Sequence, residues 1–168
     1  ANDALSSYAR PAVSPDGEWL YFVSDMPGGL GGLDIWRARI TSLGLAGVEN
    51  LGEPINTPGN EMFPTFRANG DLYFSSDGHV GMGGLDIYIA SPNDKGSYDI
   101  EHPGYPLNSQ GDDFGMTFEG VHNRGYFSSN RNDGRGWDKI YSFENPEIVQ
   151  NVKGWVYEQD GYELPEAV

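Results

Sequence analysis

The residues best suited to chemistry lie in a glycine-rich stretch, SSDGHVGMGGLDIY, which runs from Ser75 to Tyr88 and contains Asp86. Such a stretch could bind phosphate, form a metal site or simply turn the chain. A phosphate-binding loop needs its glycines to be followed by Lys-Ser/Thr and a helix, or to open a helix after a strand. The residues that follow here, Leu85 to Tyr88, are predicted to form a strand. A nucleotide site is therefore not expected.

Calcium is the sharper alternative for this loop, because carboxylates and loop carbonyls are the hard oxygen ligands that Ca²⁺ prefers. The D-x-[DN]-x-[DN]-G spacing of a calcium-binding loop is absent, however. Glycines also suit a tight connection in which the backbone takes positive φ values and neighbouring segments come close together. We therefore expect a structural loop that holds no metal ion and no cofactor.

The other reactive residue types lack the spacing that a catalytic site requires. The histidines, His79, His102 and His122, show neither H-x-x-x-H nor H-E-x-x-H spacing and are interpreted as exposed loop residues. The absence of cysteine excludes thiolate catalysis and disulfides. No G-x-S-x-G nucleophile motif occurs, and SPDGEW, which begins at Ser14, lacks the spaced glycine of the S-x-D-x-G-x-x-W box. The sequence therefore predicts that the protein is not an enzyme.

The glycine-rich stretch belongs to a unit that occurs three times. Similar stretches are VSDMPGGLGGLDIW, which begins at Val23, and SSNRNDGRGWDKIY, which begins at Ser128. Their aspartates, Asp34, Asp86 and Asp138, are separated by 52 residues in both intervals. Self-similarity at a fixed period is the signature of a repeat architecture.

Each copy is predicted to contain four antiparallel strands. A hairpin with a tight turn precedes the glycine loop, as in PTFRANGDLYFSS from Pro64, and a connector such as LGEPINTPGNE links successive copies. In the second copy the strands are expected near residues 63–67, 72–77, 86–91 and 98–101. Four strands in about 50 residues is typical of a β-propeller blade. The predicted fold is therefore all-β, with three four-stranded blades at residues 1–50, 51–102 and 103–149.

Repeat-equivalent residues are expected to share structural roles. Each aspartate should accept backbone N–H bonds in its loop and a hydrogen bond from a serine hydroxyl; these residues are Asp34, Asp86, Asp138, Ser24, Ser76 and Ser129. Three phenylalanines, each with an isoleucine beside it, are expected at one equivalent buried position; these are Phe22, Phe74 and Phe127 with Ile35, Ile87 and Ile140. The candidates for an interaction surface are Trp19, Trp137, His79 and Arg135.

Charge and composition bear on the partners. The chain carries 10 Lys+Arg against 25 Asp+Glu, a net charge of −15, and its cations are scattered. Nucleic acid and anionic membrane surfaces are therefore disfavoured. The segment VKGWVYEQDGYELPEAV, from Val152, alternates apolar and polar residues and has a turn signal at Asp160-Gly161. Residues 150–168 are thus expected to begin another β domain that is truncated here.

Three blocks of this sequence resemble the WD40-like repeats of OmpA-family proteins from bacteria with a type IX secretion system. They are SPDG…LYF.S…GGLGGLDIW, the connector and hairpin LG.PINTPG.E.FPTF..NG.LYFSSDG, and GYFSSNR..G.G.D.IY, and the resemblance covers about residues 8–145. The segment from Val152 is similar to the start of the carboxypeptidase-regulatory-like domain that follows the propeller in that family. The resemblance implies a periplasmic protein associated with the outer membrane, and a propeller of six blades of which this chain holds half.

The resemblance also implies protein partners in the cell envelope, with the remaining blades on a missing segment or a second copy. Peptidoglycan binding belongs to a C-terminal domain that this chain lacks, so it transfers to no residue here. The expected function is a non-enzymatic protein-interaction scaffold of the secretion machinery. One alternative is a glycan- or peptidoglycan-binding module in which Trp19, Trp36 and Trp137 offer stacking platforms, although Trp36 is repeat-equivalent to Tyr88 and Tyr141 and is expected in the blade core. A propeller hydrolase is a weaker alternative.

Overall fold

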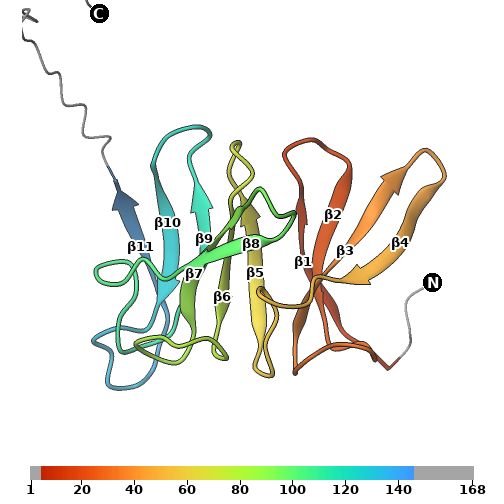
Figure 1. Ribbon diagram of the computed structural model, residues 1–168. Helices are drawn as coiled ribbons and strands as arrows, with labels where there is room; N and C mark the ends of the chain where they lie inside the picture. The colour runs from red at the N-terminus through yellow and green to blue at the C-terminus, as the bar shows by residue number, and fades with distance from the viewer. Residues whose placement is uncertain (1–4, 146–168) are drawn as a thin grey trace, which may run out of the picture.

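The computed structural model describes residues 5–145, and every regular element in this range is a β-strand (Figure 1). The predicted further β domain at residues 150–168 lies outside the described range. The strands form three antiparallel sheets, each a meander of consecutive strands. No helix long and apolar enough to cross a membrane occurs between residues 5 and 145. The chain therefore has the all-β, blade-by-blade architecture of a β-propeller segment.

The first two blades have four strands each, in sequential order. Blade 1 consists of β1 (Tyr8–Val13), β2 (Trp19–Ser24), β3 (Asp34–Thr41) and β4 (Gly44–Asn50). Blade 2 consists of β5 (Glu61–Phe66), β6 (Leu72–Ser76), β7 (Asp86–Pro92) and β8 (Tyr98–Glu101). The predicted strands of the second copy agree with these bounds to within two residues.

Within the described range, blade 3 has three strands rather than the four predicted. They are β9 (Asp113–Phe118), β10 (Arg124–Ser129) and β11 (Lys139–Glu144). Strands β3 and β7 each pair with a fourth strand, whereas β11 pairs only with β10 among residues 5–145. One edge of β11 thus has no strand beside it in this part of the chain.

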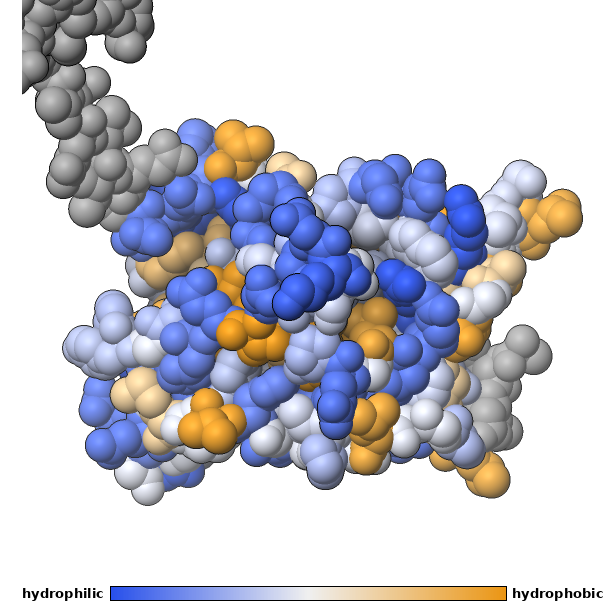
Figure 2. Space-filling model, viewed as in Figure 1, coloured by the Kyte–Doolittle hydropathy of each residue, from blue (hydrophilic) through white to orange (hydrophobic). Residues whose placement is uncertain are grey.

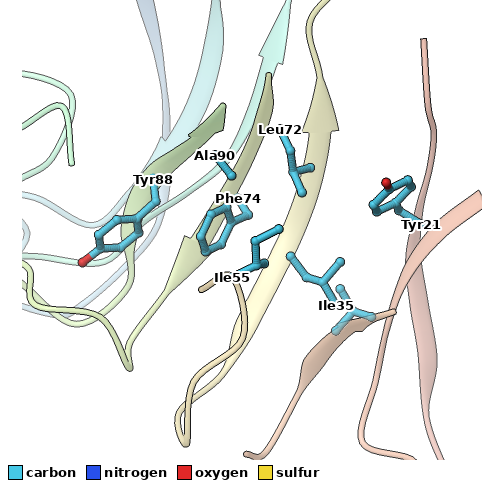
Figure 3. Close-up of a cluster of buried hydrophobic side chains, with 8 residues drawn as sticks. Tyr21, Ile35, Ile55, Leu72, Phe74, Tyr88 and Ala90 are labelled. Carbon is cyan, nitrogen blue, oxygen red and sulfur yellow. The ribbon is translucent and has the colours of Figure 1, made fainter. Parts of the chain in front are cut away.

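The core lies between successive blades, because alternate residues of each strand point to opposite faces of the sheet. Tyr21 and Ile35 of blade 1 belong to one buried cluster with Phe74 and Tyr88 of blade 2 (Figure 3). Val23 of blade 1 belongs to the same cluster. The opposite face of blade 2 presents its own buried side chains to blade 3; this second cluster contains Ile87, Met116 and Phe127. Blade 2 therefore contacts blade 1 through one face and blade 3 through the other.

Three details of the predicted core are wrong. Phe74 pairs with Tyr88 whereas Ile87 pairs with Ser75, so Phe74 and Ile87 point to opposite faces of one sheet and contact different blades. Phe74 and Phe127 are buried, but Phe22 is only half-buried, because no described blade covers its face of blade 1. Ile140 is 78% exposed, since no described blade follows blade 3.

Candidate functional site

The glycine loops of blades 1 and 2 are held by the carboxylates of Asp34 and Asp86. Asp86 Oδ2 accepts hydrogen bonds from the backbone N–H groups of Met82 (2.7 Å) and Gly83 (3.0 Å). Asp34 Oδ2 accepts from the backbone N–H of Leu30 at 2.6 Å. A Cβ atom at Gly81 would lie 2.0 Å from Asp86 Oδ2, so only glycine fits there. Gly81 is thus required because the Asp86 carboxylate folds back tightly against the loop.

The predicted hydrogen bonds from the serine hydroxyls to these aspartates do not form. Ser24 Oγ accepts a hydrogen bond from the backbone N–H of Met26, and Ser76 Oγ accepts from that of Gly78. Ser129 Oγ likewise accepts from the backbone N–H of Arg131. Each hydroxyl therefore caps the start of its loop, two residues further along the chain, and leaves the aspartate to other donors.

Asp138 does not occupy the position of Asp34 and Asp86. Asp86 pairs with Ser76 across the ladder, but Ser129 in blade 3 pairs with Lys139. Phe118 pairs with Gly125 whereas its counterpart Phe66 pairs with Leu72, so the turn of blade 3 holds one more residue between its paired positions and shifts the register of everything that follows. Asp138 is consequently exposed. The three aspartates are nevertheless evenly spaced at 52 residues, so their spacing gave no sign of this extra residue.

Asp133 supplies the carboxylate of the third loop instead. Its Oδ1 accepts a hydrogen bond from the backbone N–H of Arg135 at 2.9 Å, and its Oδ2 lies 3.1 Å from Lys139 Nζ. Hydrogen bonds from Arg135 lower the pKa of Asp133 to about 2. The third loop is therefore built around an ion pair, whereas the first two are built around a capping carboxylate.

The four predicted surface residues fall into two groups. Trp19 is half-buried beneath Arg37, whose guanidinium carbon lies 4.3 Å from the ring centroid. His79 is half-buried, and its Nε2 lies 2.9 Å from the carbonyl oxygen of Ile55. Both therefore have packing roles, and His79 is not the exposed loop residue that was expected. Arg135 and Trp137 are exposed and stack on each other at 3.9 Å in the third loop.

A buried carboxylate lies at the start of β5, the first strand of blade 2. The sequence pattern alone did not reveal that it is buried. Glu61 is fully buried and accepts hydrogen bonds from Thr57 Oγ1 (2.6 Å) and Ser76 Oγ (2.7 Å). Burial raises the pKa of Glu61. The counterpart in blade 3, Asp113, forms a 2.6 Å ion pair with Arg131. The alignment of Glu61 with Asp113 across the repeat was the available signal.

Polar atoms without hydrogen-bond partners lie beside the Asp86 loop. Asp86 Oδ1 and the Tyr88 hydroxyl are buried and unpaired, and burial, with a smaller effect of Asp86, raises the pKa of Tyr88 to about 12. His102 Nε2 lies 3.7 Å from Asp86 Oδ1 but accepts a hydrogen bond from Asn108 Nδ2, whose orientation is fixed by two bonds to Ile87. His102 therefore does not donate to Asp86 in this tautomer. No group of three His, Cys, Asp or Glu residues in the described range could hold a metal ion.

A cleft of about 940 Å³ lies between blades 2 and 3. Its apolar wall is formed mainly by aromatic side chains; among them are Tyr73, Phe118, Phe127, Tyr141 and Phe143. The last residues of β11 and the following Asn145 also line the cleft. Elsewhere, Figure 2 shows hydrophobic groups in separate spots among polar ones on the viewed face. The cleft is thus the candidate binding site within residues 5–145.

No family model matches this chain, and no curated protein matches it. Solved structures with a similar fold include a prolyl endopeptidase, at 16% identity and a TM-score of 0.47, over 83% of this chain. Puromycin hydrolase, as a variant complexed with PGG, is 14% identical with a TM-score of 0.41 over 91% of this chain. The chain spans 18% of the first of these proteins and 32% of the second. The assignment of propeller blades rests on the sheets described above.

Proposed function

We propose that this chain is a non-enzymatic propeller segment that acts as a protein-interaction scaffold. One observation carries the proposal. Ile35 and Ile87 are fully buried against the next blade, whereas their counterpart Ile140 on the outer face of blade 3 is 78% exposed. A side chain that is buried in two repeats and exposed in the third marks a surface that another protein element can cover.

The outer face of blade 1, at the opposite end of the three blades from Ile140, supports the same proposal. Leu45 of β4 pairs with Ile40 and is 57% exposed, while its counterpart Tyr98 in blade 2 packs against the core. Phe22 lies half-buried on the same face. The outer face of blade 3 corresponds to the face by which blades 1 and 2 contact the next blade. The outer face of blade 1 corresponds to the face by which blades 2 and 3 contact the preceding blade. A further blade can therefore pack on each outer face. We propose that such blades, on another segment or a second copy, complete a ring of six.

The cellular setting of the scaffold is proposed from the resemblance to WD40-like repeats of OmpA-family proteins. In this proposal the chain works in the periplasm, associated with the outer membrane, within the type IX secretion machinery. The net charge of −15 supports protein partners over nucleic acid. Binding of peptidoglycan is assigned to none of the residues of this chain.

Affinity capture from native envelopes tests the scaffold function with a matched pair of variants. Ile140→Glu places a charge on the open face of blade 3, whereas Leu43→Glu changes a residue that is 98% exposed at the tip of the β3–β4 hairpin. We expect Ile140→Glu to lose envelope proteins that wild type and Leu43→Glu both retain. Equal capture by all three proteins would contradict the proposal. Glycan binding that depends on Trp137 would favour the glycan-binding alternative.

A further inference from the structure

A histidine in blade 2 takes the place of an asparagine in blade 1. Asn50, the last residue of β4, aligns with His102, which directly follows β8, at the repeat interval of 52 residues. Asn50 uses both ends of its side-chain amide. Its Nδ2 donates to Asp34 Oδ2 at 3.1 Å, and its Oδ1 accepts from Asn56 Nδ2 at 2.9 Å. Asn50 thereby links the carboxylate of the first glycine loop to the connector that leads to blade 2.

In blade 2, one nitrogen of His102 faces both of the corresponding partners. His102 Nε2 accepts a hydrogen bond from Asn108 Nδ2 at 2.9 Å and lies 3.7 Å from Asp86 Oδ1. A neutral ring nitrogen either accepts or donates, whereas an amide does both through separate atoms. Asp34 Oδ1 and Asp86 Oδ1 are both unpaired in the described range, but the Asp34 carboxylate also receives the bond from Asn50. Asp86 receives no such bond from His102.

The orientation of Asn108 fixes the tautomer of His102. Asn108 Oδ1 accepts from the backbone N–H of Ile87 at 2.8 Å, and Asn108 Nδ2 also donates to the carbonyl oxygen of Ile87 at 2.8 Å. The group that faces His102 Nε2 is therefore a donor, so neutral His102 carries its proton on Nδ1. His79 has the opposite arrangement, because its Nε2 lies 2.9 Å from the carbonyl oxygen of Ile55, which can only accept.

The Asp86 carboxylate is the group that a protonated His102 would face. Asp86 is almost fully buried, whereas the His102 side chain is 23% exposed, so protons from solvent can reach the ring. Tyr88, whose ring centroid lies 5.1 Å from that of His102, stays neutral near pH 7, because burial, with a smaller effect of Asp86, raises its pKa to about 12. Glu101, which precedes His102, is exposed. An imidazolium beside a buried carboxylate forms a charge-assisted hydrogen bond, which is stronger than one between neutral groups.

The other charged groups of this region are engaged by other partners. Arg131 of blade 3 pairs with Asp113. Asp112 accepts a backbone hydrogen bond from the glycine loop of blade 2. Burial raises the pKa of Glu61, and the neighbouring charge that acts on it is that of His79. These groups therefore leave the imidazole of blade 2 to its two partners.

We propose that His102 is a pH-dependent switch in the joint between blades 2 and 3. Neutral His102 accepts from Asn108 and so holds the connector that leads to β9. When Nε2 takes up a proton it can no longer accept, and a shift of about 1 Å brings it within hydrogen-bond distance of Asp86 Oδ1. Acid therefore moves one hydrogen bond from the connector to the glycine loop. This inference concerns the interior of the chain and does not depend on the scaffold function.

NMR spectra of the full chain between about pH 8 and pH 5, where imidazole gains a proton, test the switch. At the higher pH we expect the nitrogen shifts of His102 to show a proton on Nδ1 and those of His79 to show one on Nε2. As the pH falls, His102 Nε2 gains a proton, and the side-chain amide signals of Asn108 should shift with the same midpoint. The side-chain amide of Asn56 is the internal control and should not shift, because its partner Asn50 does not titrate.

A variant that copies blade 1 provides the second test. His102→Asn supplies an amide that can donate to Asp86 and accept from Asn108 at the same time. Asn50 makes both bonds in blade 1, so the Asn108 amide signals should become as independent of pH as those of Asn56.

Three results would overturn the inference. The first is a proton on Nε2 of neutral His102. The second is a set of Asn108 amide signals that do not follow the titration of His102. The third is an Asn108 shift that persists in His102→Asn, because another group would then be responsible for it. The first two results need only the wild-type protein, so they hold whether or not the variant folds.

Discussion

The Asp86 carboxylate lies almost fully out of water, where it accepts two backbone hydrogen bonds from its glycine loop. Removing a buried acceptor leaves the two N–H groups unsatisfied. We expect Asp86→Ala to lower the free energy of unfolding by about 1–3 kcal/mol, measured by urea denaturation. The exposed Asp138 is the matched control, and Asp138→Ala should change stability by less than about 0.5 kcal/mol. Equal effects of the two substitutions would contradict the structural role of Asp86.

Glu61 gives a prediction about pH. Burial raises its pKa above the ordinary value of 4.5, so its protonated form contributes stability that is present below that value. This contribution is lost as the pH rises through the raised pKa. In Glu61→Gln the side chain stays neutral, so stability should shift in favour of the variant as the pH rises from about 4 to 8. Denaturation curves at both pH values check this, and a difference that is independent of pH would contradict it.

At the scale of elements, stability depends on how one blade packs on the next. Phe74 is fully buried between blades 1 and 2, whereas its counterpart Phe22 is half-buried on an open face. We expect Phe74→Ala to cost about 3–5 kcal/mol and Phe22→Ala to cost clearly less. Thermal and chemical denaturation of the two variants measure the difference. A smaller loss for Phe74→Ala than for Phe22→Ala would show that the interior interface is assigned wrongly.

The sequence is sufficient to predict the blades because turn residues and hydrophobic alternation recur locally in each copy. It predicts β8 at Tyr98–Glu101, as the structure has it. It does not predict which face of a sheet each side chain takes, because a single extra residue in the β9–β10 turn moves Lys139 into the place expected for Asp138. The packing of His79 against Ile55 also joins segments 24 residues apart, which local patterns do not encode. The cleft is lined by residues from several separate segments between Arg67 and Asn145 and was not predicted.

At the scale of the whole molecule, the three blades leave two apolar faces that no other part of residues 5–145 covers. Ile140 lies on one face and Leu45 on the other; the counterpart of Ile140, Ile87, is buried, and the counterpart of Leu45, Tyr98, is half-buried against the core cluster. We therefore expect the 168-residue chain to associate as its concentration rises, because head-to-tail contacts reproduce the interior interface. Light scattering should show a mass above 18.4 kDa that falls with Ile140→Glu and not with Leu43→Glu. A mass of 18.4 kDa at every concentration would argue against open binding faces.

Site-specific photo-crosslinking at position 140 of the full-length protein in its native envelope tests the scaffold function most directly. A photoreactive residue replaces Ile140 on the open face of blade 3, and a second protein carries it at Leu43 as a control. The scaffold function predicts a discrete cross-link from position 140 to a partner protein or to a further blade, with none from position 43. Absence of any cross-link at position 140 beyond the level at position 43 would contradict it.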